Sequence, residues 1–209
     1  LYKVNTLGLW GGAMKGLIYP DWVPVDSFPY GRGDEAFGLD YGHNNPTALI
    51  HTSFFENKLY IDECFYVTKH THRQIVNLIS ADFKNIINKS PIIVDSEEPA
   101  LIKELRLAGF NVIPSFKGPN SVYHGIMIAK QFDFYITKRS TNIINEIQAY
   151  KWKENKEGKI IDEPVKIDDH AMDAIRYVVQ TYGAKHWNKK SMADIIYKIK
   201  KKEDKFIGY

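Results

Sequence analysis

The sequence predicts an α/β protein with a mixed sheet, in which three antiparallel strands precede parallel strands and helices flank both. Three apolar segments of strand length follow one another at 36–40, 46–55 and 58–66 with short connections, which indicates an antiparallel meander. Two later apolar segments at 91–94 and 110–114 enclose a segment of helical periodicity. A strand–helix–strand order is typical of parallel pairing.

The 209-residue chain has the composition of a globular protein with one main domain, since 44% of its residues are hydrophobic and 25% are charged. No apolar run approaches the roughly 18 residues of a membrane span, and no secretory signal is visible. Cys64 is the single cysteine, which excludes an intramolecular disulfide and a cysteine-rich zinc site. We expect a protein of the cytoplasm.

The net charge of +3 is distributed unevenly. Residues 184–209 hold eight lysines against three acidic residues, a local charge of +5 that leaves −2 for the rest of the chain. The apolar residues of this tail have an amphipathic spacing, which favours binding to DNA or docking on a partner protein. Because residues 1–183 carry a net charge of −2, any contact between them and a nucleic acid must be local.

The segment before the first strand, residues 1–35, contains glycines, prolines and aromatic residues without a sustained period, and the chain does not begin with methionine. We interpret it as an arm or linker cut from a longer protein. The meander follows, and Glu56-Asn57 provides the turn between its second and third strands.

A helix is predicted after the meander. Thr71-His72-Arg73-Gln74 has the form of a capping box, and apolar residues then recur at helical spacing to about Asn88. Beyond the buried strand 91–94, Pro99 suits the first turn of a second helix, and Gly109 is placed to end that helix before the next strand.

The remaining elements complete one domain at 36–182, which a basic C-terminal tail at 183–209 follows. They are helices at 122–130, 143–149 and 169–182, a strand at 134–137, and a hairpin at 150–161 that turns around 155–158. This order of strands and helices is the one expected of an RNase H-like fold.

Three aspartates stand at the edges of apolar elements: Asp40, Asp95 and Asp173. An unpaired carboxylate beside buried β-branched residues is costly unless water, a hydrogen bond or a cation satisfies it. If strands 36–40 and 91–94 are neighbours, Asp40 and Asp95 lie near one edge of the sheet. Carboxylates from different elements suit Mg²⁺ or Mn²⁺, and in two-metal sites ions roughly 4 Å apart clamp the attacking and leaving oxygens of a phosphodiester. We expect two such ions.

The last helix places Asp173 away from its aliphatic face, together with His170 and Tyr177. His170 precedes Asp173 by three residues, so the two are neighbours on the helix surface. The imidazole could serve as ligand, proton acceptor or orienting group. Asp168 and Asp169 are candidates for the N-cap, and Asp169 is also an accessory candidate at the metal.

Several motifs resemble the nuclease domain of the large terminase subunit of tailed bacteriophages, over residues 36–182. They are Phe37-Gly38-Leu39-Asp40-Tyr41-Gly42, residues 94–99 and 117–118, Tyr150-Lys151-Trp152, and Asp169-His170-Ala171-Met172-Asp173-Ala174-Ile175-Arg176-Tyr177. The last motif is the most specific. Position 97 departs from the family, because Glu97 stands where a small residue is common; it is a second accessory candidate or a solvated residue at a helix start.

The resemblance implies an RNase H-like endonuclease of low sequence specificity that cleaves concatemeric viral DNA during genome packaging. The family's catalytic and metal-binding carboxylates map onto Asp40, Asp95 and Asp173, and its motif histidine onto His170. Residues 1–35 resemble the segment that leaves the packaging ATPase, an ATPase domain absent here because the sequence has no phosphate-binding loop. The implied partners are double-stranded DNA, that ATPase domain, the terminase small subunit and the portal, in the cytoplasm of the bacterial host.

Lysines at two places are candidates for DNA contacts. Lys117 follows a strand that should end near the site, where it could meet a phosphate or offset the carboxylate charge; an exposed loop lysine is the alternative. The predicted hairpin carries Lys151, Lys153, Lys156 and Lys159 with Tyr150 and Trp152 interleaved, and the aromatic rings could instead pack beneath it.

Two other functions remain open on the sequence alone. A Holliday-junction resolvase or a transposase-like enzyme would keep the fold and prefer branched DNA or specific ends. A non-catalytic module that docks on DNA or the portal would use the basic tail, with a merely structural acidic cluster.

Overall fold

The structure is a computed structural model that describes residues 16–56, 58–88 and 90–183. Its main sheet has seven strands in the order β1-β7-β4-β3-β2-β5-β6, and β8 and β9 form a separate hairpin. The strands of the main sheet are β1 (Trp22–Val25), β2 (Asp34–Asp40), β3 (Thr47–Phe55), β4 (Lys58–Val67), β5 (Ile92–Val94), β6 (Val112–Pro114) and β7 (Asp133–Thr137). The hairpin strands are β8 (Trp152–Glu154) and β9 (Ile160–Pro164).

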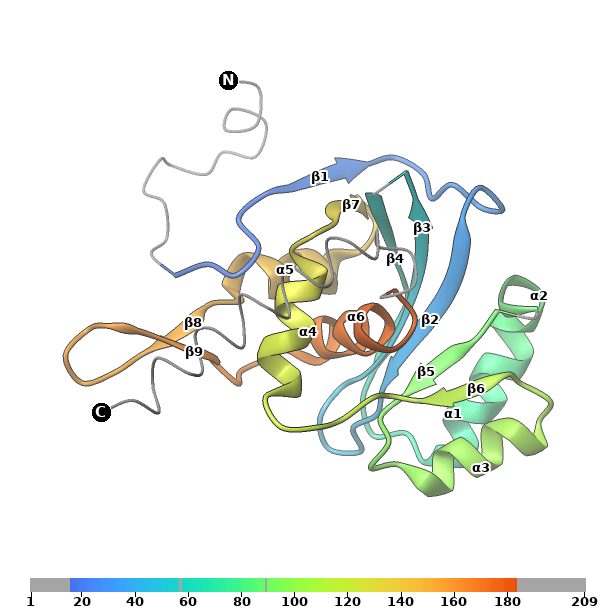
Figure 1. Cartoon of the computed structure of the whole chain (residues 1–209). Coiled ribbons are helices and arrows are strands. Elements are labelled where there is room, and N and C mark those ends of the chain that lie inside the picture. Colours follow the sequence, from blue (N-terminus) through green and yellow to red (C-terminus); the bar gives the residue numbers. More distant parts are fainter. Residues whose placement is uncertain (1–15, 57, 89, 184–209) are drawn as a thin grey trace.

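Helices cover both faces of this sheet (Figure 1). On one side lie α1 (His72–Leu78), a π-helical segment (Ile79–Phe83), α2 (Lys84–Ile87) and α3 (Pro99–Leu107). On the other lie α4 (Ser121–Ala129), α5 (Thr141–Ala149) and α6 (His170–Thr181). No helix within the described ranges combines the length and the apolar character needed to cross a membrane.

The order of elements agrees with the sequence prediction. Strands β2, β3 and β4 form the antiparallel meander, and β5 and β6 continue the sheet in parallel on the far side of β2. The predicted capping box at Thr71 is present, although the predicted helix to Asn88 is interrupted by the π-helical segment. The predicted turn at Glu56-Asn57 falls partly outside the described residues, as does nearly all of the basic tail at 183–209.

The interpretation of residues 1–35 as an arm is wrong for their second half. Strand β1 joins the edge of the main sheet in parallel with β7, and Ile18 and Tyr19 are buried in the core. A short edge strand with Pro24 inside it leaves little periodicity to detect. Residues 1–15 lie outside the described residues.

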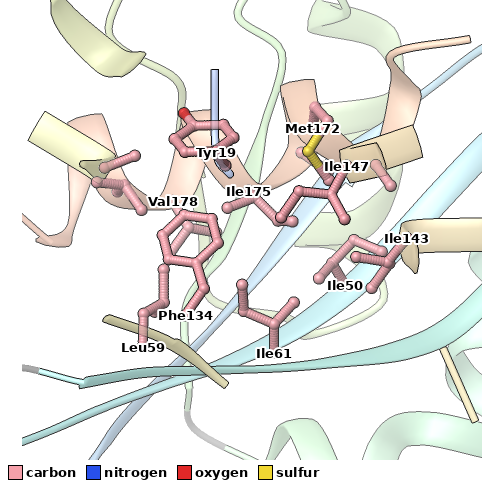
Figure 2. Packing of buried hydrophobic residues seen from close by; sticks show 14 of the residues in the cluster. Tyr19, Ile50, Leu59, Ile61, Phe134, Ile143, Ile147, Met172, Ile175 and Val178 are labelled. Atoms are coloured by element: carbon pink, nitrogen blue, oxygen red, sulfur yellow. The ribbon is translucent and has the colours of Figure 1, made fainter. Parts of the chain in front are cut away.

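Alternate residues of the central strands face two cores, one on each side of the sheet. Phe37 and Leu39 of β2 belong to the core under α1 and α3, whereas Ala36 belongs to the core under α4, α5 and α6. Figure 2 shows part of the second core, where side chains of α6 such as Val178 face strand residues such as Leu59. Burial on both faces makes the register of these strands specific.

This alternation directs two aspartates toward α6. Gly38 and Asp40 lie on the same face of β2 as Ala36, which is the face that α6 covers. Strand β5 pairs with β2 in parallel, with Leu39 opposite Val94, so Asp40 and Asp95 are the next residues in that register. Strand pairing alone therefore brings the two carboxylates together.

Gly38 sets how closely α6 approaches the sheet. A Cβ atom at this position would lie 2.2 Å from the carbonyl oxygen of Ala174 and 2.9 Å from Cγ2 of Val178. The backbone of α6 thus rests directly on the backbone of β2, a distance that only glycine permits. The first turn of α6 is held beside the end of β2, where Asp40 lies.

The first turns of α5 and α6 receive carboxylate caps from neighbouring elements. Asp169 occupies the predicted N-cap position of α6, but neither its side chain nor that of Ser140 before α5 makes a capping hydrogen bond. Glu63 of β4 instead accepts hydrogen bonds from the backbone N–H groups of Asn142 (3.0 Å) and Ile143 (3.2 Å) at the start of α5. Carboxylates are favourable at helix N-termini because of the helix dipole.

The cap of α6 comes from Glu146 of α5. Its Oε2 accepts from the backbone N–H of Met172 at 3.0 Å, and its Oε1 accepts from the Tyr66 hydroxyl at 2.7 Å. Only 5% of Glu146 is exposed, and this burial raises the pKa of the carboxyl to about 7, although the hydrogen bonds favour the charged form. Asp168, the other predicted cap, adopts a positive φ of 45° just before the helix.

We expect Gly38→Ala to destabilise the protein by about 2–4 kcal/mol, because the added Cβ forces α6 away from β2. Urea unfolding of the two proteins measures this difference. Gly118→Ala is the matched control, since its Cβ would meet only Phe116 at an ordinary 3.5 Å, and we expect a change within about 0.5 kcal/mol. Equal effects of the two substitutions would contradict the close approach.

We expect the stability of the protein to fall as pH rises from about 5 to 8, in part because of Glu146. The carboxyl of Glu146 binds a proton more tightly in the folded state, where its pKa is about 7, than in the unfolded state, where it has the ordinary value of 4.5. Proton binding therefore stabilises the folded state at low pH, and this stabilisation is lost as pH rises through the folded-state pKa. The contribution is at most on the order of 3 kcal/mol. In Glu146→Gln this loss is absent, and urea unfolding of both proteins at several pH values isolates it; parallel curves would contradict the prediction.

Candidate active site

Four side chains that the sequence analysis identified meet in one pocket of about 350 Å³. Asp40 ends β2, Asp95 follows β5, and His170 and Asp173 belong to the first turn of α6. The alternation along β2 and β5 and the helical position of Asp173 direct all three carboxylates to this point.

Asp40 is held by two side chains of α6. Its Oδ2 lies 3.0 Å from Nδ1 of His170, and its Oδ1 accepts from the Tyr177 hydroxyl at 3.2 Å. Burial raises the pKa of Asp40 above its usual value, and the hydrogen bond from His170 opposes this shift. The hydrogen bond to Asp40 in turn raises the pKa of His170, which favours the imidazolium form.

Asp95 lies closer to a positively charged side chain than Asp40 does. Nζ of Lys117 lies 2.7 Å from its Oδ1, and the Tyr177 hydroxyl donates to its Oδ2 at 2.8 Å. Burial acts to raise the pKa of Asp95, but the hydrogen bonds from Lys117, from the backbone N–H of Glu97 and from Tyr177 together hold it below its usual value. Tyr177 thus connects the two strand-end carboxylates through one hydroxyl.

Asp173 is buried, with only 8% of the residue exposed, and is paired with Arg176 one turn later. Its Oδ1 lies 2.9 Å from a terminal nitrogen of Arg176, and its Oδ2 lies 3.6 Å from Nζ of Lys166. Gly125 of α4 makes room for Arg176, because a Cβ there would lie 2.6 Å from the arginine Cγ. The guanidinium also lies over the ring of Tyr177, 4.8 Å from its centroid.

Asp169 presents an oxygen without a hydrogen-bond partner to the same pocket. Its Oδ2 is buried and accepts no hydrogen bond within the described residues; Nζ of Lys166 lies 3.9 Å away. Burial and the neighbouring Asp173 raise the pKa of Asp169. A buried carboxylate oxygen without a partner is costly, and a bound cation would satisfy it.

The remaining predicted residues divide into two groups. Glu97 and Lys117 line the pocket and form an ion pair of 2.9 Å, in which the Glu97 side chain stays 77% exposed. None of the four hairpin lysines, all of them among the described residues, lines it. The interleaved aromatic residues pack beneath the hairpin, since Tyr150 is buried and the ring of Trp152 contacts that of Tyr123.

Several side chains of the pocket were not assigned to the site from the sequence, and those that contact its carboxylates are Lys166, Arg176 and Tyr177. Arg176 stands three residues after Asp173, a spacing that places it on the same helical face and could have indicated the pair. Tyr177 was placed on the face of Asp173 but given no role. Lys166 precedes the helix in a loop and gave no local signal.

The donor set of the pocket fits a hard divalent cation. Asp40, Asp95, Asp169 and Asp173 supply carboxylate oxygens, which Mg²⁺ and Mn²⁺ prefer. As the side chains are arranged, no three metal-binding residues of the described ranges stand close enough together to hold an ion. Lysine, arginine and imidazole nitrogens provide the positive charge beside these carboxylates instead.

Comparisons with known proteins identify the family. Residues 40–181 match the family described as the terminase RNase H-like domain. The large terminase subunit of Bacillus phage SPP1 is 33% identical over 150 residues, which are 68% of this chain and 35% of that protein. The chain thus spans about a third of this relative.

Solved structures give the same result for the fold. The nuclease domain of the SPP1 large terminase with bound Mn superposes with a TM-score of 0.64 at 23% identity, over 76% of this chain and 95% of that one. The large terminase of a thermophilic bacteriophage in complex with ADP gives a TM-score of 0.63 at 26% identity, over 80% of this chain and 45% of that one. These matches confirm the RNase H-like fold, and the chain belongs to the terminase RNase H-like domain family.

Proposed function

We propose that this chain is a metal-dependent DNA endonuclease that cleaves concatemeric viral DNA during genome packaging, with low sequence specificity. The observation that carries the proposal is the convergence of Asp40, Asp95 and Asp173, from three separate elements, in one pocket. The Mn bound to the SPP1 nuclease domain supports a divalent cation as cofactor. The cofactor would be Mg²⁺ or Mn²⁺, with two ions.

The three carboxylates would hold the cations, with Asp169 and Glu97 as accessory ligands. A bound divalent cation supplies Lewis acidity to the phosphodiester and a bound water of lowered pKa. His170, whose Nδ1 faces Asp40 at 3.0 Å, would keep that carboxylate oriented and accept or hold a proton at its ring nitrogen. The Tyr177 hydroxyl contacts both Asp40 and Asp95 and would hold these two carboxylates at a fixed distance from each other.

Negatively charged groups of the protein and of the DNA would compete for Lys117. It neutralises Asp95 and Glu97 in the structure, and a DNA phosphate entering the pocket would offer it a third negative group. Release of Lys117 from Asp95 would free carboxylate oxygens for a cation. Substrate binding and cation binding would therefore support each other at this residue.

The wider assignments follow from the family. We propose double-stranded DNA as substrate, and a packaging ATPase domain, the terminase small subunit and the portal as partners in the bacterial cytoplasm. Residues 1–15 would connect to the ATPase domain, and residues 183–209 would serve as the basic tail. Residues 36–182, together with β1 and the buried Ile18 and Tyr19, would form the nuclease domain.

We expect Asp40→Asn, Asp95→Asn and Asp173→Asn each to lower the rate of plasmid nicking by at least about 100-fold, because each removes a negative charge from the site that holds the cation. Conversion of supercoiled to open-circular DNA, followed with Mg²⁺, with Mn²⁺ and with EDTA, measures this rate.

Asp26→Asn is the matched control, since Asp26 is an exposed aspartate paired with Lys138 outside the pocket, and we expect wild-type nicking. Nicking by Asp40→Asn at the wild-type rate would refute the assignment. Metal-independent DNA binding by the wild type without nicking in either cation would favour a docking module.

We expect the double substitution Lys156→Ala and Lys159→Ala to weaken DNA binding without changing kcat by more than about twofold. Both lysines are exposed near the tip of the hairpin, and loss of two phosphate contacts lowers the salt dependence of log Kd by about 2. Fluorescence anisotropy of a labelled duplex at several salt concentrations measures the slope. The control removes equal charge from the α2–α3 side with Lys84→Ala and Lys103→Ala; equal slopes for the two double variants would contradict a hairpin contact.

A further inference from the structure

We propose that Glu146 is a positioning residue of the candidate active site, which holds the first turn of α6 and thereby places His170 against Asp40. This inference rests on the proposed nuclease function and adds to it a residue outside the pocket. Glu146 belongs to α5, and its carboxylate accepts the backbone hydrogen bond of Met172, two residues after His170.

The first turn of α6 depends on this contact. The side chain of the N-cap residue Asp169 accepts no hydrogen bond from the free N–H groups at the start of the helix. A carboxylate at this place stabilises the turn through a hydrogen bond and through the helix dipole. Because Glu146 is fixed within α5, it determines where the turn lies as well as whether it forms.

A second contact joins the same group to the imidazole. The Tyr66 hydroxyl donates to Glu146 at 2.7 Å, and the edge of the Tyr66 ring packs on the ring of His170, with centroids 6.4 Å apart at 64°. Glu146 thus holds the helical turn to which His170 belongs, and Tyr66 contacts the His170 ring. On its other side, its Nδ1 meets Asp40 at 3.0 Å.

The charged groups around Glu146 support a role in orientation. The Glu146 charge contributes to the raised pKa of His170, for which the Asp40 hydrogen bond is the larger cause. Glu63 of β4 and Asp168 before α6 are the other acidic groups that act on Tyr66. The Tyr66 hydroxyl donates to Glu146, and the same carboxylate accepts from Met172, so Glu146 joins β4, α5 and α6 at this point.

The chain contains a matched control in Glu35 of β2, a largely buried glutamate that accepts a hydrogen bond from the backbone N–H of Gly31 and lies 3.0 Å from Nε2 of His51. None of these three residues lines the pocket, and none belongs to α5 or α6. We expect Glu146→Ala to lower kcat for plasmid nicking about 10- to 100-fold with KM for DNA within about twofold, which is the usual loss when a group that orients an active-site residue is removed. We expect Glu35→Ala to destabilise the protein and to leave kcat within about twofold.

The conservative substitution Glu146→Gln tests the hydrogen bond separately from the charge. Its amide oxygen can accept from Met172 and its NH₂ can donate to the Tyr66 hydroxyl, so we expect kcat within about threefold of wild type. If Glu146→Ala does not fold, Tyr66→Phe replaces it, and we expect a threefold or larger loss of kcat at unchanged KM. Wild-type kcat in the first variant that folds, or an equal loss in Glu35→Ala, would overturn the proposal.

A measurement without substrate separates this proposal from the proposed function. In the metal-free protein, we expect Glu146→Ala to accelerate hydrogen exchange of the Met172 amide at least tenfold relative to the amide of Tyr182 at the other end of α6, with little acceleration in Glu146→Gln. If the wild type does not nick DNA but this difference appears, the nuclease assignment fails and the positioning contact stands. If exchange at Met172 is unchanged in Glu146→Ala, the positioning contact fails whatever the nicking result.

Discussion

The close approach of α6 to β2 at Gly38 is the constraint on which the rest of the site depends. Two backbones meet there without an intervening side chain, so the distance between helix and strand is set by van der Waals contact between backbone atoms. His170 and Asp173 lie in the first turn of α6 and Tyr177 lies in the next, and the contact brings all three to the end of β2. A packed interface of this kind holds functional side chains more precisely than a loop would.

Charge compensation is the second organising feature of the pocket. Four carboxylates in a partly buried space would repel one another, and the fold places Lys117, Lys166, Arg176 and His170 among them. The effect differs between sites, since the pKa of Asp95 is lowered while those of Asp40 and Asp169 are raised. Asp95 has the closest lysine, and Asp40 depends on an imidazole and a hydroxyl. Asp95 is therefore readily ionised, whereas a bound cation would stabilise the charged forms of Asp40 and Asp169 more strongly.

The sequence predicted the strands and the convergence of Asp40 and Asp95 because apolar alternation and parallel register are local properties. The position of Asp173 on its helix could be predicted from the sequence for the same reason. The roles of Gly38 and Glu146 were not, since a glycine in a strand and a glutamate in a helix have many ordinary explanations. Glu146 acquires its role from Tyr66, 80 residues earlier in the chain, and no pattern within α5 indicates that contact. Strand β1 was missed because its pairing with β7 joins segments far apart in sequence.

The hydrogen bonds at the base of the hairpin have a mechanical consequence. Leu17 forms an antiparallel bridge with Lys151, Ile18 donates to the carbonyl of Tyr150, and Trp152 donates to the carbonyl of Gly16. Residues 16–18 and 150–152 therefore move together, and β1 follows directly as an edge of the main sheet. Tension applied along residues 16–18 would load these bonds in shear, in which several must break at once, instead of peeling them open singly. The hairpin is consequently anchored at two places, through the chain to α5 and through these hydrogen bonds to the N-terminal side of the domain.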